Sequence, residues 1–235
     1  MAPPHLQSHR LHRILLSIGL VVLTLGLMTP LATIAAGATP EPSSRPRDLA
    51  AIALKPLDLN TLGLQPYGIG DSRYLTIDDT ANLIAEIQEK SPTETARVLN
   101  SAHLARGYTL TNDNLTPPGD PGTGLNGFVQ STILEFPSTP AATAAYDSLT
   151  TWPSTSGVAI NASEPSLGDA SQLAAYTTGG GESPAQQVIQ LTFRSNNLVA
   201  WIIFSARTAP NDAPALMASL GQLLLEKMSL AMRQA

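Results

Sequence analysis

One stretch of the chain matches a nucleotide-binding pattern in its letters. Gly122 to Gly127 reads G-T-G-L-N-G, the glycine spacing of dinucleotide-binding loops. That spacing holds a pyrophosphate only where the glycines close a strand and open a helix. Here an alternating apolar and polar run follows, which is typical of a strand, so we interpret the glycines as a flexible loop.

A lone histidine and an acidic loop are the next candidates. His103 is the only histidine after the first 38 residues, and it lies four residues after Leu99 near the end of a predicted helix. A general base needs a nucleophile and an orienting partner, and the sequence indicates neither, so we expect a packed or helix-capping histidine. The Asp and Asn residues of 112–120 lack the acidic spacing of a calcium loop, which favours a polar surface loop.

Other signatures of catalysis are missing from the sequence. It contains no H-E-x-x-H, no P-loop and no G-x-S-x-G, and it has no cysteine for disulfides, thiolate ligands or nucleophiles. We therefore predict a protein that is not an enzyme, with no metal and no cofactor. A hydrolase that assembles Asp and Ser residues from distant positions is the least favoured alternative.

Composition limits the partners. From Thr39 onward the chain has 11 Lys and Arg against 18 Asp and Glu, a net charge of −7. No basic stripe is left to neutralise phosphates, so we exclude nucleic acid as a partner. With 235 residues, 43% of them hydrophobic, the chain is long enough for one domain with a substantial core.

The N-terminus predicts export. Arg10 and Arg13 precede an uncharged run at 14–28, and Ala36-Gly37-Ala38 has the small-residue form of a cleavage site. We expect residues 1–38 to be a signal peptide cleaved after about Ala38, which gives a secreted or cell-surface protein. The alternative is an N-terminal membrane anchor, because the uncharged stretch exceeds the ~20 residues that span a bilayer. In either case the membrane is contacted only through this segment. Residues 39–54 are predicted to be a Pro/Ser-rich linker and residues 55–235 a single extracytoplasmic domain.

The strongest structural signal is a β-hairpin over Gln186 to Ala206. A two-residue turn at Asn196-Asn197, both at positive φ, pairs Ser195 with Leu198. In that register one face is entirely apolar; its members are Ile189, Leu191, Phe193, Ala200, Ile202 and Phe204. The last predicted helix, opened by Asn211 or Asp212, has a leucine-rich stripe long enough to cover this face.

The second face of the hairpin is mixed and supplies the candidate ligand-binding residues, Trp201, Arg194, Thr192 and Val199. A Trp beside an Arg on an exposed face is a typical binding anchor. The sequence assigns no element to cover this face, so we predict that it is the floor of any binding site. The alternative is that a helix covers Trp201, which is common for a Trp in mid-strand.

The remaining elements are read from periodicity and capping. Leu49 to Tyr74 is expected to be coil that packs its leucines on the domain. Helices are predicted from Thr76, from Ser91-Pro92 to a C-terminal Gly107, and from a capping Thr139 to Trp152. Strands are predicted at 108–112, 127–136, 158–161 and 172–178. The order strand, strand, helix occurs at 108–149 and again at 186–230, which suggests an internal ββα duplication.

Several of these stretches resemble a known family. They are Phe128 to Phe136, Thr139-Pro140-Ala141-Ala142 with Tyr146, Leu167-Gly168-Asp169, Val188 to Arg194 and Asn197-Leu198-Val199. Together they resemble exported bacterial sensor-type domains, the extracellular domains of actinobacterial receptor serine/threonine kinases and related lipoproteins. The resemblance covers Gly127 to Arg233 and implies an α+β fold with a curved antiparallel sheet and a ligand groove. This chain departs from it in having no cysteine and no kinase or lipidation signal.

The expected function is therefore a non-catalytic ligand-binding or sensor-like module in the cell envelope, with an unknown small ligand. The alternative is an envelope accessory or scaffold protein that binds another protein through an apolar patch.

Overall fold

The structure is a computed structural model that describes residues 47–88, 90–113, 115, 127–152, 159–161, 165–180, 183–207 and 212–234. Its helices are α1 Leu49–Ile52, α2 Pro56–Thr61, α3 Ile77–Gln88, α4 Pro92–Ser101, α5 Thr139–Leu149 and α6 Ala213–Gln234. Its strands are β1 Gly68–Leu75, β2 Arg106–Asp113, β3 Phe128–Glu135, β4 Ala159–Asn161, β5 Ala170–Gly180, β6 Ser183–Ser195 and β7 Leu198–Ala206. Within these ranges no helix combines the length and apolar character needed to cross a bilayer.

The strands form one antiparallel sheet in the order β1-β2-β3-β7-β6-β5-β4. The predicted hairpin lies at its centre, and its register is confirmed, with Ser195 opposite Leu198 and Phe193 opposite Ala200. The turn differs from the prediction, because only Asn196 has a positive φ, of 53°. Asn197 is held by the neighbouring strand instead: its side-chain amide donates to the carbonyl oxygen of Phe136 at 2.7 Å, and its own carbonyl accepts from the N–H of Phe136.

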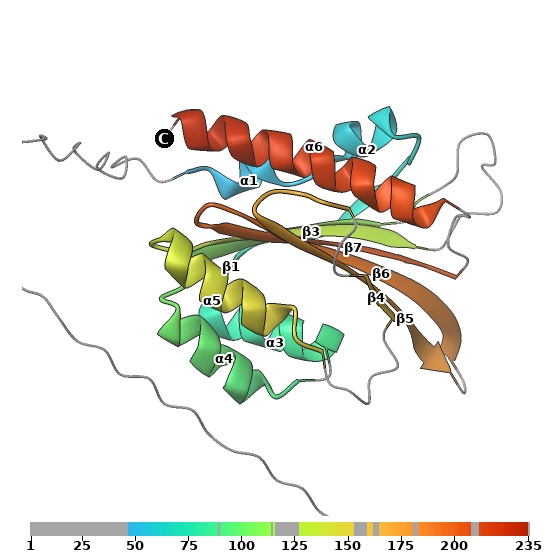
Figure 1. The fold of residues 1–235 in the computed structure, drawn as a ribbon. Coiled ribbons are helices and arrows are strands. Elements are labelled where there is room, and N and C mark those ends of the chain that lie inside the picture. Colours follow the sequence, from blue (N-terminus) through green and yellow to red (C-terminus); the bar gives the residue numbers. More distant parts are fainter. Residues whose placement is uncertain are drawn as a thin grey trace, which may run out of the picture. The chain divides into compact units, whose positions relative to one another are not determined.

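Helices cover both faces of the sheet, so the protein has three layers (Figure 1). Helix α6 lies over one face together with the short α1 and α2, and α3, α4 and α5 lie over the other. We call these the α6 face and the α3/α5 face. The predicted α+β class, an antiparallel sheet with packed helices, is confirmed.

The α6 face holds the larger apolar core. Successive residues of a strand point to opposite faces, so the even-numbered residues of β7 and the odd-numbered residues of β6 meet α6. Leu191, Phe193, Ile202 and Phe204 are completely buried there against Met217, Leu220, Leu224 and Met228. The predicted cover of the hairpin by the last helix is confirmed.

The predicted boundary between the linker and the domain, after residue 54, is wrong. Residues 49–54 were assigned to the linker, but Leu49, Ile52 and Leu54 lie at 0–1% exposure in the α6-face core. Two buried polar side chains of the sheet fix this segment: the backbone N–H of Leu54 donates to Ser131 Oγ at 3.0 Å, and Asn112 Nδ2 donates to the carbonyl oxygen of Leu54 at 2.9 Å. Residues 49–54 read L-A-A-I-A-L, without proline or serine, so the Pro/Ser-rich stretch ends before them; the sequence does not show the long-range hydrogen bonds that fix them.

The expected coil at 49–74 is also wrong in part, because it contains α1, α2 and most of β1. Pro56 occupies the first turn of α2, a position where its missing N–H costs nothing. The leucines do pack on the domain as predicted, with Leu59 and Leu64 buried.

Two helix ends shift relative to the prediction. Helix α4 begins at its Ser91 cap as expected but ends at Ser101, and His103 with φ 53° takes the left-handed position assigned to Gly107. The N–H of Leu104 then donates to the carbonyl oxygen of Leu99, which completes a Schellman-type end, so His103 is the helix-capping histidine. Helix α5 is capped by Ser138, one residue before the predicted Thr139.

The two ββα units differ in hand. The units β2-β3-α5 and β6-β7-α6 lie next to each other in the sheet, but α5 and α6 pack on opposite faces. Because β3 and β7 are antiparallel, superposing β2-β3 on β6-β7 takes a rotation about an axis perpendicular to the sheet. Such a rotation leaves each face of the sheet on its own side, so α5 is not superposed on α6. Internal duplication stays a hypothesis that this arrangement argues against. The G-T-G-L-N-G stretch lies outside the described residues, except for Gly127.

Candidate functional site

Three of the four predicted ligand-binding residues are core residues. Trp201 is 2% exposed, Thr192 3% and Val199 0%, under the layer formed by α3 and α5. Ile84 of α3 and Leu149 of α5 belong to the same apolar cluster as Trp201 and line the same small cavity. The alternative that a helix covers Trp201 is therefore the one the structure shows: α3 and α5 carry apolar stripes that the sequence indicated but could not assign to a face.

The fourth residue, Arg194, holds a loop. Its Nη1 donates to the Asp169 carboxylate at 2.8 Å, and its backbone carbonyl accepts from the N–H of Asp169 at 2.7 Å. The same carboxylate accepts the N–H of Asn196 in the hairpin turn, also at 2.7 Å. Asp169 therefore ties the segment before β5 to the end of the central hairpin.

The segment 165–169 packs closely against α6 on the α6 face. Gly168 has φ +61°, and a Cβ there would lie 2.2 Å from the carbonyl oxygen of Arg194, so only glycine fits. Leu167 is buried against Gly221 of α6, where a Cβ would lie 2.4 Å from Leu167 Cδ1. Ser171 Oγ donates to the carbonyl of Pro165 and accepts from the N–H of Leu167, which closes the loop.

This loop, α2 and α6 border an open groove of about 560 Å³, which we call the α2–α6 groove. Its lining consists of Thr61 and Leu62 from the end of α2, Pro165, Ser166 and Leu167 from the loop, and Ala218, Ser219, Gln222, Leu223 and Glu226 from α6. The lining alternates apolar side chains with hydroxyl and amide groups, and Glu226 is its one charged member. Such a mixture suits an apolar body that carries a hydrogen-bonding end.

The α2 wall of the groove is fixed to α6. Lys227 Nζ donates to the carbonyl oxygen of Ala53 at 2.9 Å and pairs with the Asp58 carboxylate. Asp58 in turn accepts from the N–H of Lys55 and so caps the start of α2. The groove is therefore built on three elements that are held by specific hydrogen bonds.

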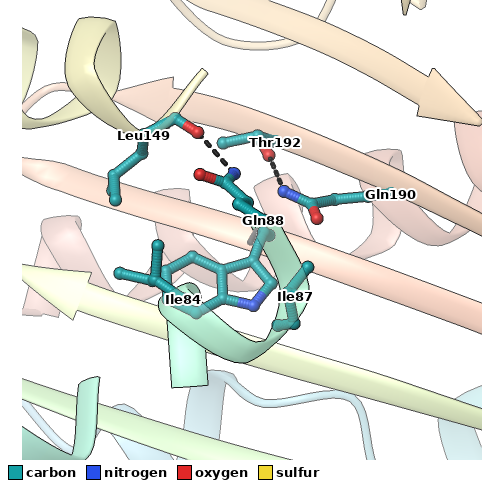
Figure 2. A pocket seen from close by; sticks show the side chains of 7 residues that line it. Ile84, Ile87, Gln88, Leu149, Gln190 and Thr192 are labelled. Carbon is teal, nitrogen blue, oxygen red and sulfur yellow. Dashed lines mark hydrogen bonds between the residues drawn. The ribbon is translucent and has the colours of Figure 1, made fainter. Parts of the chain in front are cut away.

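A second feature lies on the opposite face. A small cavity of about 10 Å³ lies between α3 and the sheet, and its lining includes Trp201 together with Gln88, Gln190 and Thr192, which Figure 2 labels. Gln88 Nε2 donates to the carbonyl oxygen of Leu149 at 2.6 Å, and Gln190 Nε2 donates to Thr192 Oγ1 at 3.0 Å. Two predicted ligand-binding residues, Trp201 and Thr192, thus meet at a cavity too small for an organic ligand.

Burial also marks two tyrosines of this face. The pKa of Tyr146 is raised to about 12, chiefly by burial and secondly by Asp147, while Arg194 acts in the opposite direction. Burial raises the pKa of Tyr176 as well, whose ring packs against Trp152 with the centroids 5.3 Å apart. Across the described ranges, no three His, Cys, Asp or Glu side chains lie close enough together to hold a metal ion.

Sequence reasoning missed the groove. Its α2 wall lay in a stretch interpreted as coil, and its loop was noticed only as the Leu167-Gly168-Asp169 part of the family resemblance. The available signal was Gly221, a glycine in the middle of an otherwise leucine-rich helix, which marks a close approach.

The fold and groove define an α+β domain with a seven-stranded antiparallel sheet and a surface groove. The sequence matches no protein-family model and no curated protein. Among solved structures, the chain is similar to the extracellular domain of PknH from Mycobacterium tuberculosis. The identity is 15%, the TM-score 0.46, and the match covers 75% of this chain and 94% of that one. The resemblance to receptor-kinase extracellular domains that the sequence indicated therefore recurs in the structure comparison.

Proposed function

We propose that this chain is a non-catalytic, extracytoplasmic ligand-binding module of the sensor-like kind, and that its ligand binds in the α2–α6 groove. The observation that carries the proposal is the groove itself, whose volume of about 560 Å³ is that of a small-molecule site. The extracytoplasmic location is inferred from the leader at residues 1–38.

The lining indicates the ligand class. Leu62, Leu167 and Leu223 offer an apolar surface, and Glu226 is the single charge, so a neutral or cationic amphiphile fits better than an anion. Of the four residues predicted from the sequence, Arg194 contributes indirectly by holding the loop through Asp169. A role for Trp201, Thr192 and Val199 as a ligand floor would require α3 to move away from the sheet.

The test is a fragment screen by NMR on the ¹⁵N-labelled full chain, with small alkyl and aryl amides, alcohols and amines as probes. We expect amide shift changes that cluster at Thr61, Ser166 and Ser219. A Ser219→Trp variant, which fills the groove from α6, is expected to abolish them. Ala215→Trp is the matched control, because Ala215 is exposed one turn earlier on α6 and does not line the groove. Shifts that survive in Ser219→Trp, or no binding by any probe class, would contradict the proposal.

A different observation favours the second candidate, an envelope accessory protein. Tyr67, Ile69 and Tyr74 lie at or beside the edge strand β1 and are 68%, 55% and 55% exposed. Exposed apolar side chains along a sheet edge are typical of a protein-binding surface. A stoichiometric partner that is recovered from membranes by the wild type and lost with Tyr67→Ser and Ile69→Thr would favour this role over small-ligand binding.

A further inference from the structure

The small cavity of the α3/α5 face has the size of one water molecule. It lies between α3, the end of α5 and strands β6 and β7 (Figure 2). Its volume is about 10 Å³, and a buried water needs roughly 10–15 Å³ on this measure. The lining consists of Ile84, Ile87, Gln88, Leu149, Gln190, Thr192 and Trp201.

Three polar atoms of this lining lack hydrogen-bond partners among the described residues. They are the donor Trp201 Nε1 and the acceptors Gln88 Oε1 and Gln190 Oε1. Each belongs to a side chain that is at least nine-tenths buried, with exposures of 2%, 3% and 4%. An unsatisfied buried polar group costs about 1–3 kcal/mol, so three such groups on residues that line one cavity call for a bound partner.

The orientation of the two amides is set by their other contacts. The carbonyl oxygen of Leu149 can only accept, so the Gln88 group that faces it at 2.6 Å must be the NH₂ group, and Oε1 is the free end. Gln190 is less constrained, since the Thr192 hydroxyl both donates and accepts. Either orientation of Gln190 leaves one polar group that a water can pair with.

We propose that this cavity binds a single structural water, which accepts a hydrogen bond from Trp201 Nε1 and donates to the side-chain oxygens of Gln88 and Gln190. Three hydrogen bonds is the usual number for a buried water. A metal ion or an ammonium group is excluded as the occupant, because neither accepts a hydrogen bond from the indole. The site is independent of the α2–α6 groove, which lies on the opposite face of the sheet.

The test uses the full ¹⁵N-labelled chain and the two indole N–H signals. We expect a cross-relaxation peak between the Trp201 indole N–H and water. Its sign should be the one that a long-lived bound water gives. Trp152 is the internal control, since its Nε1 donates directly to Gln172 Oε1 at 3.2 Å. A high-resolution crystal structure is expected to show one spherical density peak at hydrogen-bond distance from Trp201 Nε1.

A double variant, Gln88→Leu with Gln190→Leu, replaces both acceptors by apolar groups and is expected to abolish the Trp201 cross-peak. Should that variant not fold, the wild-type spectrum and density decide alone. A wild-type Trp201 signal without bound-water cross-relaxation, or a cavity without density, would overturn the proposal.

Discussion

The two faces of this sheet are built from alternate residues of the same strands, yet they bury different chemistry. On the α6 face, the core positions of β6 and β7 are Leu191, Phe193, Ile202 and Phe204. On the α3/α5 face, the corresponding interior includes Thr109, Gln130, Thr132, Gln190 and Thr192 around Trp201, all less than 9% exposed. Both faces bury apolar side chains, but the second buries more polar groups as well, whose hydrogen bonds each need their partner.

Because of this difference, the helix layers on the two faces have separate roles. The apolar α6 face fixes α6 rigidly, and that rigidity lets α6 serve as one wall of the groove. The α3/α5 face has side-chain hydrogen bonds such as Gln130 Nε2 to Thr109 Oγ1, at 3.0 Å, and unpaired atoms at the Trp201 cavity. It is therefore the face where local opening should cost less free energy.

The largest effect is expected from truncating the α6-face core. Phe204→Ala removes a completely buried ring from the centre of the sheet and should lower the free energy of unfolding by about 3–5 kcal/mol. Urea denaturation followed by circular dichroism measures this. Ile203→Val, one residue earlier and on the α3/α5 face, removes a single methylene and should cost about 0.5–1.5 kcal/mol. A loss in Phe204→Ala no larger than that in Ile203→Val would show that the α6-face core is not closely packed around Phe204.

Alkaline pH should weaken the α3/α5 face selectively. Burial raises the pKa of Tyr146 from 10.0 to about 12 in the folded protein. A raised pKa means that the folded state holds the phenol proton more tightly, so the contribution is complete below pH 10 and is lost as pH rises towards 12. The loss should reach about 2–3 kcal/mol.

Denaturation in urea across this pH interval measures the loss, and Tyr146→Phe should flatten the pH dependence. If the pH dependence of the free energy of unfolding is unchanged in Tyr146→Phe, other groups cause the loss of stability. Tyr176, whose pKa burial also raises, is the next residue to replace, since it lies on the same face.

A smaller effect is expected where α6 meets the loop. Alanine is the better helix former by about 1 kcal/mol, yet Gly221→Ala would place a Cβ 2.4 Å from Leu167 Cδ1 and 2.6 Å from Leu191 Cδ2. Overpacking of a filled core costs about 1–3 kcal/mol, so a net loss of roughly 1 kcal/mol is expected. Adding Leu167→Ala to Gly221→Ala should recover part of it. If Gly221→Ala alone stabilises the protein, the close approach of loop and helix is not tight.

The sequence predicted the α6 face well because its pattern is local. Alternation in 186–206 and a helical stripe of leucines are both visible within one segment, and their complementarity predicted the contact. The α3/α5 face could not be predicted this way, because the apolar stripe of α3 gave no indication of which face it covers. Leu54 and Asp169 show the same limit, since their roles depend on hydrogen bonds to Ser131 and Arg194, far away in the chain.

The smallest predicted effect is an energetic coupling between two side chains, and it tests the difference between the two faces most directly. Thr132 and Thr109 share a hydrogen bond of 2.9 Å on the α3/α5 face, whereas Ile133, the next residue, points to the α6 face. Thr132→Val should cost about 1 kcal/mol and should couple to Thr109→Val by about 0.5–1 kcal/mol, since each removes the hydrogen bond that the two hydroxyls share, while Thr109 Oγ1 can keep its bond from Gln130 Nε2.

The same Thr132→Val should be additive with Ile133→Val within about 0.3–0.5 kcal/mol, because the two side chains lie on opposite faces and share no partner. Double-mutant cycles from urea denaturation measure both quantities. Coupling of Thr132 to Ile133 as strong as that to Thr109 would mean that the sheet transmits packing changes between its faces, and the two layers would then have to be treated as one core.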